Sequence, residues 1–270
     1  GGGVPAVVGR EVGGVEAEAV AGVSDRGNRG AGLRLLGEVA HRGADHVALL
    51  QQADAHDFVM IEDDYEAENL YEGEPMPALK SLDKVGRVIY VGSISKSLSP
   101  SLRLGYIVAP RVLIAELRVL RHAMVRHPSA FLQHAFAHFL SLGHHEPHAR
   151  RVNQALQLRM QALQQAMHQW LPDFEFDLPT GGASVWVRAP QWVDTGELAR
   201  MAREQGVLIE AGEVFFMHPP YPCPYFRLRL SSIPVEQIAP GIQLLAKAVH
   251  TLASARGVPR LLTGLVPSGR

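Results

Sequence analysis

A lysine in a hydroxyl-rich loop is the residue of this chain best suited to covalent chemistry. Lys96 follows Ser93 and Ser95, and Arg103 comes seven residues after it. Hydroxyl groups and an arginine fork together suit a phosphate. An amine that is held near cations and partly desolvated loses its proton readily enough to form an imine. The loop therefore predicts carbonyl chemistry beside a phosphate site, although a single loop lysine is more often just a solvated charge.

An acidic residue upstream of the lysine fits the same chemistry. Asp63 follows a short apolar run, and Tyr65 comes two residues later. An anionic Asp beneath a pyridine ring keeps the ring nitrogen protonated, which makes such a cofactor an electron sink. Tyr65 could donate a hydrogen bond to the phenolate oxygen of the ring. The plainer alternative is that these residues cap a helix or solvate a turn.

Three strands are expected to position these side chains. The apolar run 58–61 predicts a buried strand, and residues 87–91 and 104–109 predict two more. Ligands of open α/β sheets bind beyond the carboxyl ends of the strands. We therefore expect Asp63 and Lys96 to lie at one edge of a sheet.

The rest of the chain alternates between helical and extended patterns. Helices are expected at 49–56, 112–124, 129–142, 146–170, 195–205 and 235–252, and further strands at 183–187, 207–210 and 226–230. This alternation predicts an α/β architecture whose first part ends near Gly143, followed by a smaller α+β part.

The acidic run and the lysine loop together resemble those of a known family. Fold-type-I pyridoxal-phosphate (PLP) aminotransferases carry stretches similar to Glu62-Asp-Asp-Tyr65 and Ser93-Ile-Ser-Lys-Ser-Leu-Ser-Pro-Ser-Leu-Arg-Leu-Gly-Tyr106. The similarity is greatest to the aminotransferase-like domain of MocR/GabR-type transcription regulators. The resemblance implies part of an aspartate aminotransferase-like large domain with a mostly parallel sheet, and a smaller α+β C-terminal domain.

The resemblance also implies roles for the residues of the loop and the acidic run. Lys96 becomes the catalytic Schiff-base lysine. Asp63 becomes the partner of the pyridine nitrogen, and Tyr65 lies near the ring oxygen. The implied phosphate ligands are Ser93, Ser95 and Arg103.

An arginine in the second part has an implied role too. The run Tyr225-Phe-Arg-Leu-Arg-Leu-Ser-Ser232 is similar to the last strand of the family's small domain. Arg227 would then grip the α-carboxylate of the substrate, for which a planar fork is suited. Arg229 is expected to point to the opposite face of the strand from Arg227. The plainer alternative for either arginine is a surface ion pair.

Two functions are compatible with this resemblance. The first is an aminotransferase that uses PLP to exchange amino groups between an amino acid and a 2-oxo acid. The second is an amino-acid sensor of a regulator, in which DNA is bound only through a separate winged helix-turn-helix domain. An inactive fragment is a third alternative. The resemblance further implies a homodimer.

The beginning of the chain is unlike the rest. Residues 1–46 contain no Phe, Tyr, Trp, Ile, Met or Lys, so they offer little apolar surface to offset the entropy of ordering them. They are expected to be a disordered leader or, as the favoured alternative, an out-of-frame translation of a fragment whose family similarity begins near Ala48. The expected divisions are 1–46, 47–145 for the partial large domain, 146–255 for the small domain and 256–270 for a tail.

Composition argues against several classes of function. The 26 Lys and Arg residues balance 27 Asp and Glu residues, which gives no reason to expect direct binding to nucleic acid or a membrane surface. A single cysteine, Cys223, excludes an intrachain disulfide, and no apolar run reaches the length of a membrane span. A cytoplasmic protein is expected. His134 and His138 at i, i+4 invite a metal hypothesis, but no metal-binding motif supports it.

Overall fold

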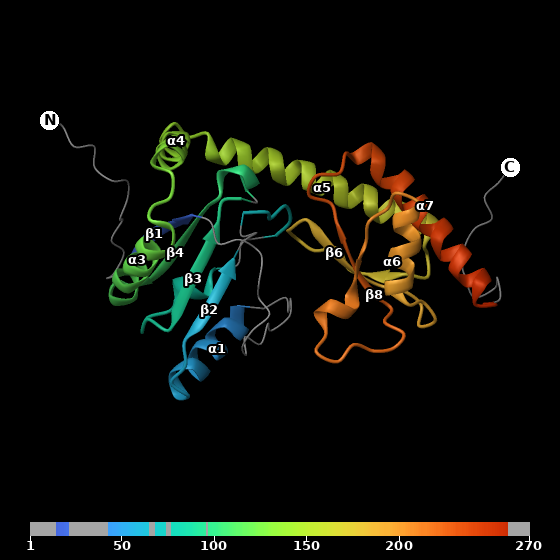
Figure 1. Cartoon of the computed structure of the whole chain (residues 1–270), viewed down its shortest axis with the longest axis horizontal. Coiled ribbons are helices and arrows are strands. Elements are labelled where there is room, and N and C mark those ends of the chain that lie inside the picture. The colour runs from blue at the N-terminus through green and yellow to red at the C-terminus, as the bar shows by residue number, and fades with distance from the viewer. Residues whose placement is uncertain (1–14, 22–42, 65–67, 74–76, 96, 259–270) are drawn as a thin grey trace. The chain divides into compact units, whose positions relative to one another are not determined.

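The computed structural model describes residues 15–21, 43–64, 68–73, 77–95 and 97–258. The chain forms two compact units (Figure 1). The first unit comprises residues 1–68 and 74–150, and the second comprises 69–73 and 151–270. None of the helices within the described ranges combines the length and the hydropathy that crossing a membrane would require.

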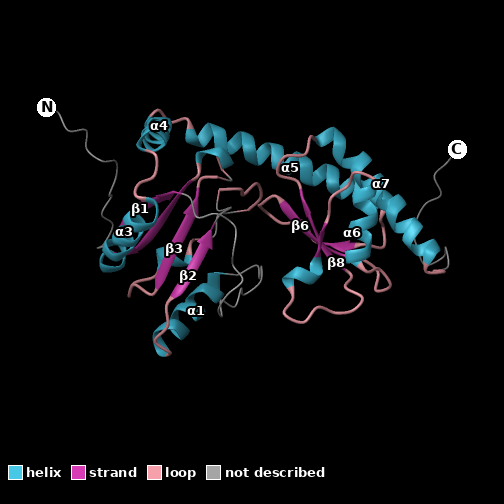
Figure 2. Ribbon diagram, in the orientation of Figure 1, coloured by secondary structure: helices cyan, strands magenta, loops and turns pink. Residues whose placement is uncertain are grey.

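The first unit contains a four-stranded sheet (Figure 2). Its strands, in spatial order, are β1 (Val15–Ala21), β4 (Leu104–Pro110), β3 (Val88–Ser93) and β2 (Met60–Asp64). β2 and β3 are parallel, whereas β4 is antiparallel to both β3 and β1. β1 falls within the stretch 1–46, for which the sequence predicted no strand.

The expectation of a mostly parallel sheet is therefore wrong for the described strands. Parallel neighbours need a crossover connection of about a dozen residues or more. Only the loop 94–103 joins β3 to β4, so the chain turns back and β4 runs antiparallel. The mixed α/β class itself is confirmed.

The prediction of a buried strand at 58–61 is also wrong in part. β2 begins at Met60, and Phe58, Val59 and Ile61 are 39%, 56% and 55% exposed. β2 is the edge strand of the described sheet, and the face that carries Ile61 is open. The neighbouring β3 buries Val88 and Tyr90 on the other face.

Most helices of the first unit lie where the sequence pattern predicts them, although the first begins at Gly43, six residues before its predicted start. The helices are α1 (Gly43–Ala55), α2 (Leu79–Leu82), α3 (Arg111–Val125), α4 (Ala130–Ser141) and the start of α5 (His145–Trp170). Ser129 begins α4 by accepting a hydrogen bond from the backbone N–H of Leu132. The short α2 and the 3-10 turn at Pro100–Leu102 had no signal in the periodicity.

The second unit is an antiparallel sheet packed with helices. Its strands, in spatial order, are β5 (Glu175–Phe176), β6 (Ser184–Arg188), β8 (Tyr225–Arg229) and β7 (Glu210–Ala211). Its helices are residues 151–170 of α5, α6 (Thr195–Glu204) and α7 (Val235–Ala255). Leu163, Phe226 and Leu245 are fully buried in its core. The expected smaller α+β part is confirmed, although β7 is shorter than predicted.

A short upstream segment completes the second unit. Leu70 forms an isolated bridge with Gly181, and the backbone N–H groups of Tyr71 and Glu72 donate to the carbonyl oxygen of Thr180 at 3.1 and 3.0 Å. A Cβ at Gly181 would lie 2.4 Å from the carbonyl oxygen of Asn69. Glycine is therefore required at position 181 for this close approach.

Candidate functional site

The predicted site residues fall in both units. Asp63, Ser93, Ser95 and Arg103 belong to the first unit, and Arg227 belongs to the second. Lys96 and Tyr65 lie outside the described residues. The predictions for their roles stay predictions.

Strand register brings the predicted residues of the first unit to one edge of the sheet. Asp63 pairs with Val91 across the parallel strands, and Ser93 pairs with Gly105 across the antiparallel ones. Arg103 directly precedes β4, so the end of β3 and the start of β4 meet at the same edge. The loop that contains Lys96 begins and ends there.

Of the three consecutive acidic residues, two have structural partners. The Glu62 carboxylate accepts hydrogen bonds from the backbone N–H groups of Leu79 and Lys80 at 2.7 and 2.9 Å, which caps α2. Asp64 accepts a hydrogen bond from the Tyr90 hydroxyl at 3.1 Å. Both carboxylates are thus engaged in holding the fold.

Asp63 differs from its neighbours. Its side chain lies on the opposite face of β2 from Glu62 and Asp64, and it is exposed. No hydrogen bond or ion pair to its carboxylate is found among the residues that the structure describes. Partial burial raises the pKa of the Asp63 carboxyl, and the negative charge of Asp64 adds to the rise. A cation placed beside Asp63 would relieve both effects.

The serines and the arginine have the chemistry of a phosphate site. The Ser93 side-chain oxygen accepts a hydrogen bond from the backbone N–H of Ser95 at 3.2 Å, which bends the chain just before Lys96. Arg103 is exposed and adopts the left-handed backbone conformation, with φ 50°. A carboxylate, hydroxyls and a guanidinium at one sheet edge fit a phosphorylated pyridine cofactor.

A histidine from α5 supports this loop, and the sequence gave no sign of it. The Nε2 atom of His148 lies 2.9 Å from the backbone carbonyl oxygen of Ser97. A carbonyl oxygen can only accept, so Nε2 carries the proton. The two residues are 51 positions apart, and only the tertiary structure brings them together.

The histidine-rich stretch otherwise packs around one aromatic ring. The ring centroids of His144, His145 and His148 lie 5.9, 6.4 and 6.1 Å from that of Phe139. The Nε2 atom of His145 also lies 3.0 Å from a carboxylate oxygen of Glu68. Within the described ranges, no group of three or more His, Cys, Asp or Glu side chains could hold a metal ion.

A glycine and a tyrosine shape the same edge. A Cβ at Gly92 would lie 2.3 Å from the Cζ atom of Tyr106, so the tyrosine ring can cross β3 only because residue 92 is glycine. The Tyr106 ring lies 5.9 Å from that of Tyr90. Burial raises the pKa of both hydroxyls, which therefore stay neutral.

In the second unit, Arg227 is held by two neighbours. Its Nε atom donates a hydrogen bond of 2.8 Å to the Oε2 atom of Glu210, and its Nη2 atom forms an ion pair with the same oxygen at 2.7 Å. Its Cζ atom lies 4.7 Å from the ring centroid of Phe215. Arg229 is exposed and lies on the same face of β8 as Arg227, because residues two apart along a strand share a face; the expectation that it points to the opposite face is wrong. The sequence had given no role to Glu210.

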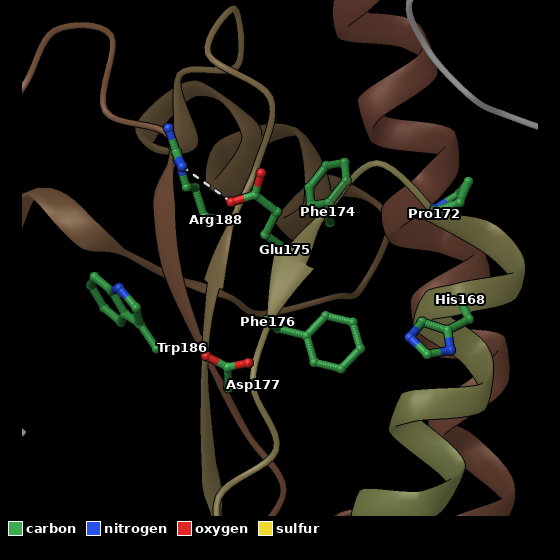
Figure 3. Close-up of a pocket in the computed structure, with 8 residues that line it drawn as sticks. All are labelled: His168, Pro172, Phe174, Glu175, Phe176, Asp177, Trp186 and Arg188. Carbon is green, nitrogen blue, oxygen red and sulfur yellow. Dashed lines mark hydrogen bonds and ion pairs between the residues drawn. The ribbon is translucent and has the colours of Figure 1, made fainter. Parts of the chain in front are cut away.

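A separate hollow in the second unit does not include the predicted residues (Figure 3). It has a volume of about 570 Å³ and is lined by His168, Pro172, Phe174, Glu175, Phe176, Asp177, Trp186 and Arg188. An ion pair of 3.1 Å joins Arg188 to Glu175 at its side. The hollow is wide and lacks the lysine, serines and arginine that carry the predicted chemistry.

Comparisons with known proteins identify the family. The family model "Aminotransferase class I and II" matches residues 42–244. The HTH-type transcriptional regulator TauR of Rhodobacter capsulatus is 44% identical over 76% of this chain and 42% of its own length. Aromatic-amino-acid aminotransferase 1 of Thermococcus litoralis is 32% identical over 74% of this chain and 48% of its own length.

Solved structures give the same result. The α-aminoadipate aminotransferase of Thermus thermophilus, complexed with N-(5'-phosphopyridoxyl)-L-leucine, has a TM-score of 0.72 and 27% identity. The match covers 78% of this chain and 55% of that one. The chain thus spans about half the length of the relatives it matches.

Proposed function

The chain belongs to the aminotransferase class I and II family, and from that premise we propose that it is a PLP-binding domain that transfers amino groups between an amino acid and a 2-oxo acid. The observation that carries the proposal is the meeting of Asp63, Ser93 and Arg103 at the sheet edge where the loop of Lys96 begins and ends. The similarity to both MocR-type regulators and aminotransferases supports it.

PLP, when bound, supplies a carbonyl group that forms a Schiff base with Lys96 and a ring that withdraws electrons. Asp63 would hold the protonated ring nitrogen. Its raised pKa, and the lack of a hydrogen bond or ion pair to its carboxylate among the described residues, support this role. Ser93, Ser95 and Arg103 would hold the phosphate, and Tyr65 would donate to the ring oxygen.

Two residues would act on the substrate. Arg227 would bind the substrate carboxylate through its guanidinium. Lys96 would serve as the base that moves a proton at the substrate α-carbon. The substrate is thus an α-amino acid, and its product is the corresponding 2-oxo acid.

A second function has its own support. The regulator TauR is 44% identical to this chain over the matched region. In a sensor, the same residues would bind PLP and an amino acid, and the resulting closure would be passed to a DNA-binding domain elsewhere in the protein. A 2-oxo acid product formed by the purified chain from an amino acid and PLP would favour the enzyme, and binding without product would favour the sensor.

The remaining features of the proposal concern organisation. We assign residues 47–145 to the large domain and 146–255 to the small domain. We place the protein in the cytoplasm as a homodimer whose partners are small molecules.

The experiment that tests the proposal is PLP binding by the purified chain. Wild-type protein should develop an absorbance band at about 420 nm that survives dialysis, and Lys96→Ala should not. A folded wild-type chain without the band would contradict the proposal.

A further inference from the structure

The Glu210–Arg227 pair uses only one edge of the guanidinium. A guanidinium presents two edges to a carboxylate, a side edge of Nε and Nη2 and an end edge of Nη1 and Nη2. Glu210 binds the side edge, because a single oxygen, Oε2, accepts a hydrogen bond from Nε at 2.8 Å and lies 2.7 Å from Nη2. In the described residues, no hydrogen bond to Nη1 is found, so the end edge is available to a second carboxylate.

A ring fixes the plane of the same guanidinium. Arg227 Cζ lies 4.7 Å from the centroid of Phe215. Phe215 in turn packs edge-on against Trp186, with ring centroids 5.3 Å apart. The Arg227 side chain is 18% exposed and that of Glu210 is 47% exposed. One carboxylate and one ring therefore set the orientation of the guanidinium, while its side chain keeps a route to solvent.

Strand β7 is also held by contacts other than this pair. Ala211 pairs with Phe226 in the antiparallel ladder. A Cβ at Gly212 would lie 2.4 Å from the carbonyl oxygen of Tyr225, so the two backbones are already in close contact.

We propose that Glu210 is a positioning residue that holds Arg227 by its side edge and reserves the end edge for the substrate carboxylate. This inference rests on the proposed function, in which Arg227 binds the substrate. Because the negative charge of Glu210 offsets the positive charge of Arg227, the pair attracts simple anions only weakly. A planar carboxylate can still bind by two parallel hydrogen bonds, so the site selects its ligand by geometry rather than by charge.

The test is nuclear magnetic resonance of the arginine Nε–H groups in the full chain, titrated with sodium propionate and, separately, with sodium chloride. The signal of Arg227 is the one that Arg227→Lys removes. In wild type this signal should shift saturably with propionate and only slightly with chloride. Glu210→Ala should weaken propionate binding about tenfold, or about 1.4 kcal/mol. Glu210→Gln should retain most of the affinity, since its amide oxygen can still accept.

Each other outcome has a definite meaning. If folded Glu210→Ala binds propionate as tightly as wild type or more tightly, Glu210 competes with the ligand for Arg227, and the inference is overturned. The substrate role of Arg227 would not be affected by this outcome. If the Arg227 signal of wild type does not shift with propionate, both the inference and the substrate role of Arg227 are overturned. PLP binding at Lys96 is measured separately by absorbance. A failure to bind PLP can therefore be told apart from a failure of the Glu210 inference or of the substrate role of Arg227. Circular dichroism melts show whether each variant folds.

Discussion

The Nε2 atom of His148 donates a hydrogen bond of 2.9 Å to the backbone carbonyl oxygen of Ser97, the residue that follows Lys96. The first residues of α5 thereby hold one side of the loop that the proposed function depends on. A hydrogen bond of this kind typically contributes about 1 kcal/mol.

His148→Phe should lower the affinity for PLP about fivefold, in line with that energy. Phenylalanine keeps a ring beside Phe139 but cannot donate to Ser97. PLP titration followed by absorbance measures the effect. His145→Phe is the matched control, because His145 also packs against Phe139 and does not contact Ser97 in the structure. An unchanged affinity in a folded His148→Phe chain would show that the contact does not matter for the loop.

Asp63→Asn should abolish PLP binding without destabilising the chain. The pKa of Asp63 is raised in the folded chain, so its ionised form opposes folding. This penalty is absent below the unfolded pKa of about 3.9 and is fully present above the folded pKa. At pH 7, without PLP, the variant should be as stable as wild type or slightly more so, within about 0.5 kcal/mol.

Thermal melts of apo Asp63→Asn and wild type between pH 3 and pH 7 check this prediction. The small difference at neutral pH should vanish at the acid end. A clear loss of stability at pH 7 would mean that Asp63 supports the fold rather than a ligand.

Asp83 is expected to show the opposite behaviour, because it is the anchor of β3. Its carboxylate accepts from the backbone N–H groups of Gly86, Arg87 and Val88 at 2.9, 3.0 and 2.8 Å and from Lys80 Nζ at 3.0 Å. Burial opposes its ionisation, but these hydrogen bonds together lower the pKa of Asp83 to about 2.

Because the pKa of Asp83 is lowered, its stabilisation is complete above the unfolded pKa of about 3.9 and is lost as the pH falls towards about 2. Asp83→Asn should cost about 2 kcal/mol at pH 7 and much less near pH 2, measured by urea unfolding. Asp57→Asn, which removes an exposed ion pair with Arg87, should cost less than about 1 kcal/mol. If the two variants lose the same free energy of unfolding at pH 7, Asp83 does not anchor β3.

The sequence predicted most elements because their ends carry clear signals. Gly92 and Pro110 mark the ends of β3 and β4, and Ser129 marks the start of α4. The burial of β2 was misjudged, because a short apolar run does not reveal that its strand lies at a sheet edge. β4 runs antiparallel to β3 because the loop between them is too short for a parallel crossover. The pattern of apolar residues in the strands does not contain this information.

The geometry of the candidate site was predictable only where it follows from neighbouring residues in the sequence. Alternation along β2 separates Asp63 from Glu62 and Asp64. The contacts of His148 with Ser97 and of Glu210 with Arg227 join positions 51 and 17 residues apart. Such pairs depend on tertiary packing and strand register, so no spacing rule could identify them.

The most direct test of the central claim is to trap PLP on the chain with sodium borohydride and locate it by mass spectrometry. The chain has only four lysines, Lys80, Lys84, Lys96 and Lys247, so the assignment is unambiguous. The account predicts that the phosphopyridoxyl group is found on Lys96 and that Lys96→Arg stays unlabelled. Labelling spread evenly over the other lysines, or unchanged in Lys96→Arg, would contradict it.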